Sequence, residues 1–90
     1  MKAMDTKQVE HRLIRIIIGP RPIDQNTITA DTTFAQLEVD SFDAISIVFD
    51  IEAEFGIKVP DSEVYELRTV GDVFTGVKRL LNEQNRLINP

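Results

Sequence analysis

The 90-residue sequence has no cysteine, no tryptophan and a single histidine, His11. Without cysteine, the chain can form neither a disulfide framework nor a cysteine-based zinc site. Long apolar runs are also missing: the run IIIGP at residues 16–20 is interrupted by glycine and proline, so no segment reaches the length of a membrane-spanning helix. Since the first residues, MKAMDTKQVEHR, lack the apolar stretch of a signal peptide, we expect a soluble cytoplasmic protein.

Basic residues are few relative to acidic ones: 10 Lys and Arg stand against 15 Asp and Glu, and the pI is about 4.7. Nucleic acids and anionic membranes recruit basic surfaces, so this balance argues against both as partners and against membrane insertion. It favours instead a partner protein with a basic surface. We expect a monomer that forms one domain over residues 1–90.

The apolar residues that are present recur at helical spacing, which predicts an all-α fold without strands. Three long helices are expected over residues 6–18, 41–55 and 70 to about 82. Gly19-Pro20 and Gly56 end the first two, because proline cannot continue a helix and glycine readily adopts the left-handed conformation of a helix C-terminus. Thr69 caps the last helix, with Asp72 completing a capping box.

A shorter helix from Pro60-Asp61 to about Leu67 completes a four-helix bundle with its core over residues 6–82. Residues 83–90 are expected to be frayed. The loop over residues 19–40 is unusually long for so small a domain, and such loops are often functional. A single helical turn starting at residues 31–33 is expected within it, and its predicted core anchors are Ile28, Phe34 and Leu37.

A helix over residues 41–55 presents three faces when successive residues are placed 100° apart. The core face consists of Ala44, Ile47, Val48, Ile51 and Phe55. The solvated face consists of Asp43, Asp50 and Glu54. The third face consists of Phe42, Ile45, Ser46, Phe49 and Ala53, with Glu52 at its edge. This third face is more apolar than a surface helix requires, so either the loop or the short helix covers it, or it is a docking surface.

Ser41 stands at the start of this helix, between Asp40 and Phe42, and two roles fit that position. As a helix cap, its hydroxyl accepts a backbone N–H and stabilises the fold by about 1 kcal/mol. As a site of modification, it places a phosphate ester at a helix N-terminus, where partial positive charge and unpaired N–H groups favour an anion. The residue pattern by itself leaves both roles open.

Four motifs, in order and at the right spacing, resemble the acyl carrier protein family. Asp40-Ser41-Phe42 followed by Asp43 resembles the family's Asp-Ser-Leu core at the start of its second helix. Residues 52–60, EAEFGIKVP, match its acidic helix end and Ile-x-Ile-Pro connection. Residues 69–73, TVGDV, match its start of helix four, and residues 33–37, TFAQL, its turn before the serine. The resemblance spans about residues 6–81 and identifies the chain as a member of the family.

The resemblance implies that Ser41 carries 4′-phosphopantetheine, transferred from coenzyme A by a phosphopantetheinyl transferase (a holo-carrier synthase), with Asp40 and Phe42 beside the attachment point. Acyl groups then travel as thioesters from an acyl-loading enzyme to a ketosynthase or acyltransferase of fatty-acid, lipid or polyketide-type biosynthesis. The chain itself is neither an enzyme nor a metal protein on this reading. An acyl chain can enter the core of such bundles, and the residues that would line its pocket, or else are plain core, are Ile47, Val48, Ile51, Val64 and Leu67.

Several positions depart from the family's pattern. Glu38 replaces a frequent glycine, and Phe42 replaces the common leucine. Fatty-acid-synthesis members usually carry acids where Ser46 and Ala53 stand, whereas Ile45 and Phe49 make this surface more apolar. We therefore expect a specialised bacterial carrier serving a dedicated pathway. Its expected partner-docking residues are Asp43, Ile45, Ser46, Phe49, Glu52 and Ala53.

Other classes of function fit less well or remain open. An EF-hand calcium site fails because residues 31–43 lack the central glycine and the spaced oxygen ligands. A serine hydrolase would need a partnered histidine, but His11 lies on a polar stretch of the first helix with no constellation around it. An aminoacyl or peptidyl carrier and an unmodified helical interaction module remain as alternatives, because the loading enzyme chooses the cargo.

Overall fold

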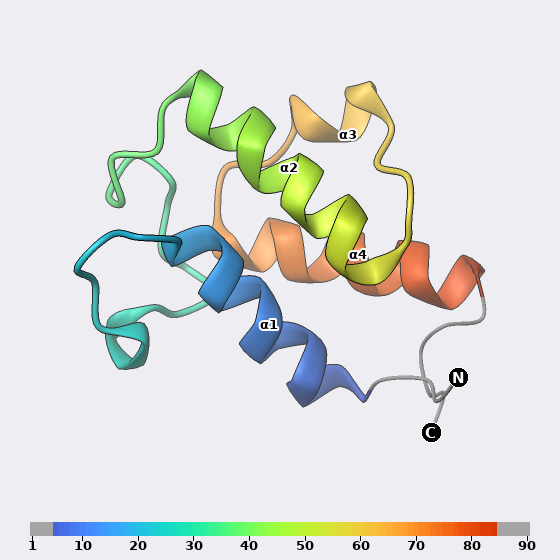
Figure 1. Ribbon diagram of the computed structural model, residues 1–90, viewed down its shortest axis with the longest axis horizontal. Helices are drawn as coiled ribbons and strands as arrows, with labels where there is room; N and C mark the ends of the chain where they lie inside the picture. The colour runs from blue at the N-terminus through green and yellow to red at the C-terminus, as the bar shows by residue number, and fades with distance from the viewer. Residues whose placement is uncertain (1–4, 85–90) are drawn as a thin grey trace.

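The computed structural model describes residues 5–84, which form an all-α bundle (Figure 1). Its helices are α1 (Thr6–Ile18), α2 (Ser41–Phe55), α3 (Asp61–Val64) and α4 (Val70–Glu83), with a 3₁₀ turn, η1 (Gln25–Thr27), in the long loop. The predicted bounds of α1 and α2 are confirmed. Among the described residues no strand forms, only an isolated antiparallel bridge between Thr33 and Thr69. Within the same part of the chain, no helix is long and apolar enough to cross a bilayer.

Reciprocal capping boxes define where the long helices begin. In α4 the Thr69 hydroxyl accepts the N–H of Asp72 at 3.1 Å, and the Asp72 carboxylate accepts the N–H groups of Thr69 and Arg68 at 3.0 and 2.9 Å. The backbone N–H groups of Arg68 and Thr69 stabilise the ionised carboxylate, which lowers the pKa of Asp72. The cap predicted at Thr69 is therefore confirmed, as is Gly56, which ends α2 with a left-handed φ of 64°.

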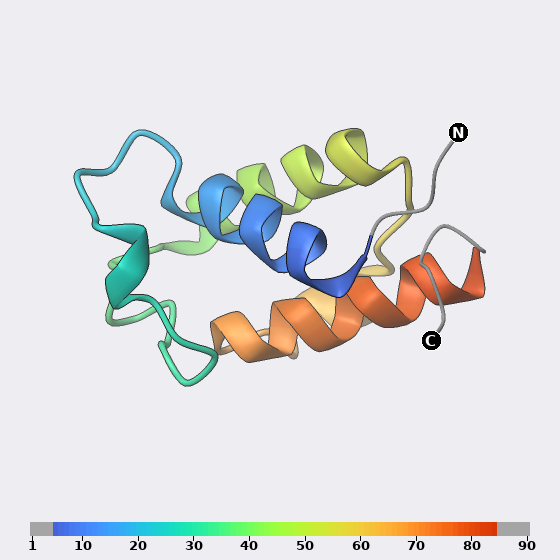
Figure 2. The same cartoon turned by 90° about the horizontal axis from the view of Figure 1, so that it is seen from below.

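Helix α1 packs against both α2 and α4 (Figure 2). Its buried residues Val9, Leu13 and Ile17 are at most 1% exposed and form the centre of the core. Helix α2 contributes Ile47, Val48, Ile51 and Phe55, and α4 contributes Val70, Val73, Val77, Leu80 and Leu81. No polar or charged residue among those described is buried, so apolar burial holds the bundle together.

The loop between α1 and α2 is fastened to the start of α4. The N–H groups of Val70 and Gly71 donate to the carbonyls of Thr32 and Ala30 at 2.9 and 2.8 Å. A Cβ on Gly71 would lie 2.9 Å from the Ala30 carbonyl oxygen, so only glycine permits this approach. The predicted anchors are confirmed: Ile28 is buried, and Phe34 and Leu37 are partly buried against the core. These contacts fix the loop that leads into Ser41.

Several boundaries differ from the expectations. Helix α3 ends at Val64 rather than near Leu67, and residues up to Leu67 continue as turns in which Glu66 and Leu67 donate to carbonyls three residues earlier. The 3₁₀ turn η1 was not predicted. The loop's helical turn starts at Thr33, within the expected residues 31–33: the Thr33 hydroxyl accepts the Gln36 N–H, and the Gln36 side chain accepts the Thr33 N–H. Helix α4 continues through Glu83, so the frayed segment cannot begin there. The rest of that predicted segment, residues 85–90, lies outside the described residues.

Candidate functional site

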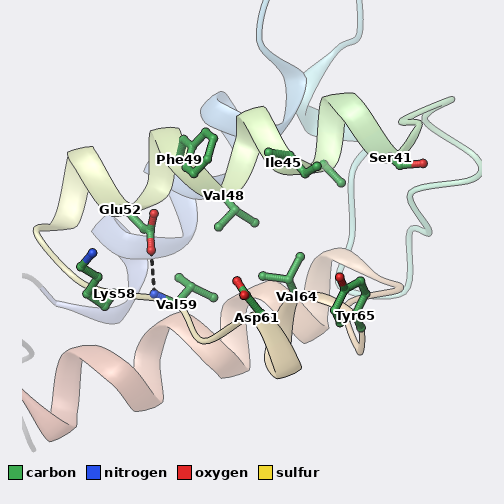
Figure 3. A pocket seen from close by; sticks show the side chains of 11 residues that line it. Ser41, Ile45, Val48, Phe49, Glu52, Lys58, Val59, Asp61, Val64 and Tyr65 are labelled. Carbon is green, nitrogen blue, oxygen red and sulfur yellow. Dashed lines mark hydrogen bonds between the residues drawn. The ribbon is translucent and has the colours of Figure 1, made fainter.

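Ser41 is the first residue of α2, but the N-terminal capping box of this helix is formed by its neighbours Asp40 and Asp43. Asp40 is the cap: one of its carboxylate oxygens accepts the N–H of Asp43 at 2.9 Å, and the Asp43 carboxylate accepts the N–H of Asp40 at 3.4 Å. Of the two roles left open for Ser41, that of the helix cap is excluded, because the extended backbone conformation of a cap falls one residue earlier, at Asp40. The Ser41 side chain is exposed at the end of α2 (Figure 3).

The segment before Asp40 is held in an unusual backbone conformation. Glu38 has a φ of 57°, in the left-handed region that residues other than glycine rarely adopt. A non-glycine residue there costs roughly 1 kcal/mol or more. The turn sets the direction in which the chain enters Asp40 and Ser41.

An open groove of about 680 Å³ runs between α2 and the segment that contains α3. It begins at Ser41 and reaches Lys58, with Val48, Val59 and Val64 lining its interior (Figure 3). The complete lining consists of Ser41, Ala44, Ile45, Val48, Phe49, Glu52, Lys58, Val59, Asp61, Val64 and Tyr65. The groove therefore connects the exposed serine with a largely apolar channel along α2.

One hydrogen bond crosses the far end of the groove. The Glu52 carboxylate accepts the backbone N–H of Val59 at 2.9 Å, which joins the end of α2 to the connection before α3 (Figure 3). Helix α3 itself is tied elsewhere, because its Glu63 pairs with Arg79 of α4. The groove thus lies between α2 and a helix that is fastened to α4.

We call the side of α2 that borders this groove the groove flank, defined by Ile45, Val48, Phe49 and Glu52. Two of its three apolar residues are not covered: Ile45 is 47% exposed and Phe49 is 63% exposed, whereas Val48 is buried. Phe42 beside Ser41 is 82% exposed, and Tyr65 across the groove is 85% exposed. Ser46 and Ala53 are also exposed, while Glu52 is partly buried. Neither the loop nor α3 covers this face, which removes the simplest structural explanation for its apolar residues.

The opposite side, which we call the α1 flank, carries Asp43, Asp50 and Glu54. Arg21, in the loop after α1, lies 2.7 Å from the Asp43 carboxylate. Arg12 of α1 lies 2.7 Å from the Glu54 carboxylate. Ion pairs therefore join α2 to α1 and its loop near both ends of the helix, while Asp50 between them is exposed.

The five predicted pocket residues Ile47, Val48, Ile51, Val64 and Leu67 come together around an interior cavity of about 40 Å³. Only Val48 and Val64 also line the open groove. Ile47 and Ile51 are buried core residues, as their helical spacing predicts. With Ala44, Val48 and Val64 line both hollows, so these three residues stand between the groove and the interior.

Sequence reasoning missed the residues that complete the groove and the ion pairs. Lys58, Val59, Asp61 and Tyr65 lie in a connection and a four-residue helix, where no periodic pattern marks a lining. Arg21 stands between Pro20 and Pro22, and its pairing with Asp43 spans the whole loop. Only the tertiary structure brings it to the start of α2.

Ser41 and the single histidine, His11, line different hollows. His11 lies on α1 beside a separate hollow that it shares with Ile14, Gln25, Asn26 and Ile28. Across residues 5–84, no cluster of histidine and acidic side chains could hold a metal ion. An exposed hydroxyl at a helix N-terminus fits a phosphate ester, because the helix dipole favours an anion there.

The chain is similar to known proteins in sequence and in fold. The family model described as "Phosphopantetheine attachment site" matches residues 12–75. The acyl carrier proteins of Rickettsia canadensis (strain McKiel) and Rickettsia typhi (strain Wilmington) are each 34% identical over 74 residues, covering 81% of this chain and 86% of theirs. The crystal structure of an acyl carrier protein from Thermotoga maritima superposes with a TM-score of 0.76 and 29% identity, covering 88% of this chain and 93% of that one.

Proposed function

Because this chain belongs to the acyl carrier protein family, whose members carry acyl groups on 4′-phosphopantetheine, we propose that its prosthetic group is attached to Ser41. One observation carries the proposal: the Ser41 hydroxyl is exposed at the start of α2, outside the cap, at the mouth of an open groove. The chain is a carrier whose cargo is bound as a thioester, and the chemistry on that cargo belongs to partner enzymes.

A transferase would make the attachment by moving the phosphopantetheinyl group from the pyrophosphate linkage of coenzyme A to the Ser41 hydroxyl. The Ser41 oxygen forms the new bond to the phosphorus that bears the pantetheine arm of coenzyme A, and 3′,5′-ADP leaves with the electrons of the broken bond. The hydroxyl proton passes to a base on the transferase. This supplies a thiol to a chain that has no cysteine. The requirement for coenzyme A supports a cytoplasmic location.

The groove flank receives the acyl chain in this account. Val48 and Val64 separate the groove from the 40 Å³ interior cavity, and Ile47, Ile51 and Leu67 line that cavity. A cavity this small holds little of an acyl chain, so a long cargo must displace these side chains or remain in the open groove. Burying apolar cargo in either place removes about 25 cal/mol of unfavourable free energy per Å² of apolar surface covered.

The exposed side chains around the groove dock the partner enzymes. Phe42, Ile45 and Phe49 offer apolar contact next to Ser41, with the exposed Ser46 and Ala53 beside them. Asp43, which is paired with Arg21, and Glu52, which accepts the Val59 N–H, border this surface. Transferase, acyl-loading enzyme and ketosynthase or acyltransferase must each reach the arm at this end of α2. Aromatic side chains frequently supply the largest share of such binding energy.

This apolar docking surface supports a specialised carrier that serves a dedicated pathway. A housekeeping fatty-acid carrier presents acids to basic partners, but here Ser46 and Ala53 are uncharged and Phe49 is exposed. The holo-protein should therefore be a poor substrate for fatty-acid elongation enzymes. Elongation rates equal to those of a housekeeping carrier from the same cell would contradict this part of the proposal.

The attachment residue is tested by intact mass after incubation with coenzyme A and a broad-specificity phosphopantetheinyl transferase. The wild-type protein should gain the mass of one phosphopantetheine, and Ser41→Ala should gain none. Because Asp40 rather than Ser41 caps α2, this variant should lose less than the roughly 1 kcal/mol of a missing cap.

Ser62→Ala is the matched control, because Ser62 also follows an aspartate, at the start of α3, and is exposed. This variant should be modified like the wild type. A mass gain that persists in Ser41→Ala would move the attachment elsewhere. Failure of the wild type with several transferases would make the chain an unmodified interaction module.

A further inference from the structure

Asp43 lies in the first turn of α2, two residues after Ser41, where any enzyme that reaches the serine also meets its carboxylate. That carboxylate is already engaged twice. One of its oxygens accepts the Asp40 N–H at 3.4 Å, and the same oxygen lies 2.7 Å from a guanidinium nitrogen of Arg21. The acid nearest to Ser41 in the helix is thus paired within the chain.

Arg21 is held in place independently of Asp43. Its neighbours Pro20 and Pro22 each fix one backbone dihedral angle, which limits the freedom of the loop. Its guanidinium donates to the carbonyl oxygens of Ile17 and Ile18, each at 3.4 Å, and its backbone N–H donates to Ile18 at 3.1 Å. The carbonyl end of α1 carries partial negative charge and attracts a cation, so the guanidinium is pre-positioned beside α2.

The pair changes the charge that a partner enzyme meets at Ser41. A free Asp43 would attract an approaching arginine or lysine, but the Arg21–Asp43 pair is neutral and its cation repels another cation. Charges at the rim of an interface act mainly on the association rate and on its dependence on salt. At physiological ionic strength they act over about 8 Å, which is enough to influence an enzyme docking at Ser41.

We infer that Arg21 determines partner specificity by withholding the Asp43 charge from basic enzymes at the Ser41 end of α2. The inference rests on the proposed modification of Ser41. It deepens that proposal by naming the partners that the site disfavours, those that recognise the first turn of α2 through arginine or lysine. Partners that dock on the apolar groove flank are unaffected, so the surface selects for them.

The test uses a phosphopantetheinyl transferase with a basic docking surface as the probe. Two rates are measured with the intact protein: association of the apo-form with the immobilised transferase, and coenzyme A-dependent modification of Ser41. At about 20 mM NaCl, Arg21→Gln should raise both rates roughly threefold to tenfold. Near 1 M NaCl, where charges act over about 3 Å, the gain should fall below about twofold.

Three variants separate masking from a structural role of Arg21. Arg21→Lys keeps the charge and should keep most of the wild-type rate and salt dependence. In an Asp43→Asn background, Arg21→Gln should lose at least about half of its effect, because no charge is left to release. Thermal unfolding should change little, since the pair is partly exposed, with the Arg21 and Asp43 side chains 24% and 42% accessible, and such ion pairs contribute about 0–1 kcal/mol.

The outcomes distinguish this inference from the function on which it rests. If Arg21→Gln is modified at the wild-type rate or more slowly, or if its gain is the same with and without Asp43, the masking role is overturned while Ser41 remains the attachment residue. If neither the wild type nor Arg21→Gln is modified by any transferase, the proposed function fails and this inference fails with it.

Discussion

On the α1 flank of α2, Arg21 and Arg12 already occupy the acids Asp43 and Glu54, whereas on the groove flank Ile45 and Phe49 face solvent beside an open channel. The two flanks belong to one helix of 15 residues. On the α1 flank, arginines of the same chain pair with the acids of α2. The groove flank has few such contacts within the chain. Among residues 5–84, the hydrogen bond that Glu52 accepts from Val59 is the only one that crosses to the opposite wall of the groove.

This difference indicates a division of labour around Ser41. The α1 flank positions the start of α2 and its serine. Each of its ion pairs contributes only about 0–1 kcal/mol to stability. Apolar packing against α1 therefore supplies most of the free energy that keeps α2 in place. The groove flank keeps apolar surface uncovered, and covering it later with cargo or a partner releases free energy at about 25 cal/mol per Å². The α1 flank of α2 therefore contributes to folding stability, and the groove flank is available for binding.

The largest effect should come from placing a charge on the groove flank. Phe49→Glu should slow acylation of the holo-protein by an acyl-loading ligase roughly tenfold or more, because a carboxylate at a docking contact must lose its hydration. Modification by a transferase should remain possible. Initial rates of acyl transfer, followed by intact mass, measure both steps.

Asp50→Ala, on the opposite α1 flank, is the control and should change the acylation rate by less than about twofold. Phe49 is 63% exposed, so Phe49→Glu should also stay folded, with a loss of unfolding free energy of at most about 0.5 kcal/mol. If the variant unfolds, Phe49 belongs to the core and is not a docking residue of the groove flank.

A smaller effect should distinguish the two acids near the end of α2. Glu52→Ala removes the bond that the carboxylate accepts from the Val59 N–H and leaves a partly buried donor without that partner, which should cost about 1–2 kcal/mol of unfolding free energy. Glu54→Ala removes a surface pair with Arg12 and should cost about 0.5 kcal/mol or less. Urea unfolding of the two variants measures the difference. Equal losses would mean that the groove is not held by its single crossing bond.

The helices were predictable because periodic apolar residues and the stops at Gly19-Pro20 and Gly56 act locally. The cap of α2 was not, since aspartate and serine both cap helices and only the backbone conformation of Asp40 decides between them. The exposure of Phe49 also required the structure, because its coverage depends on where α3 is fastened. The Arg21–Asp43 pair joins residues across a long loop, and no sequence pattern predicts it.

The most direct test of the account is to locate the cargo on the two flanks. Amide NMR spectra of the holo-protein are compared with those of the same protein carrying an octanoyl thioester as a probe. The account predicts shifts along the groove, at Val48, Val59 and Val64, and none at Arg12 or Arg21. Shifts confined to the immediate neighbours of Ser41, or concentrated on the α1 flank, would contradict it.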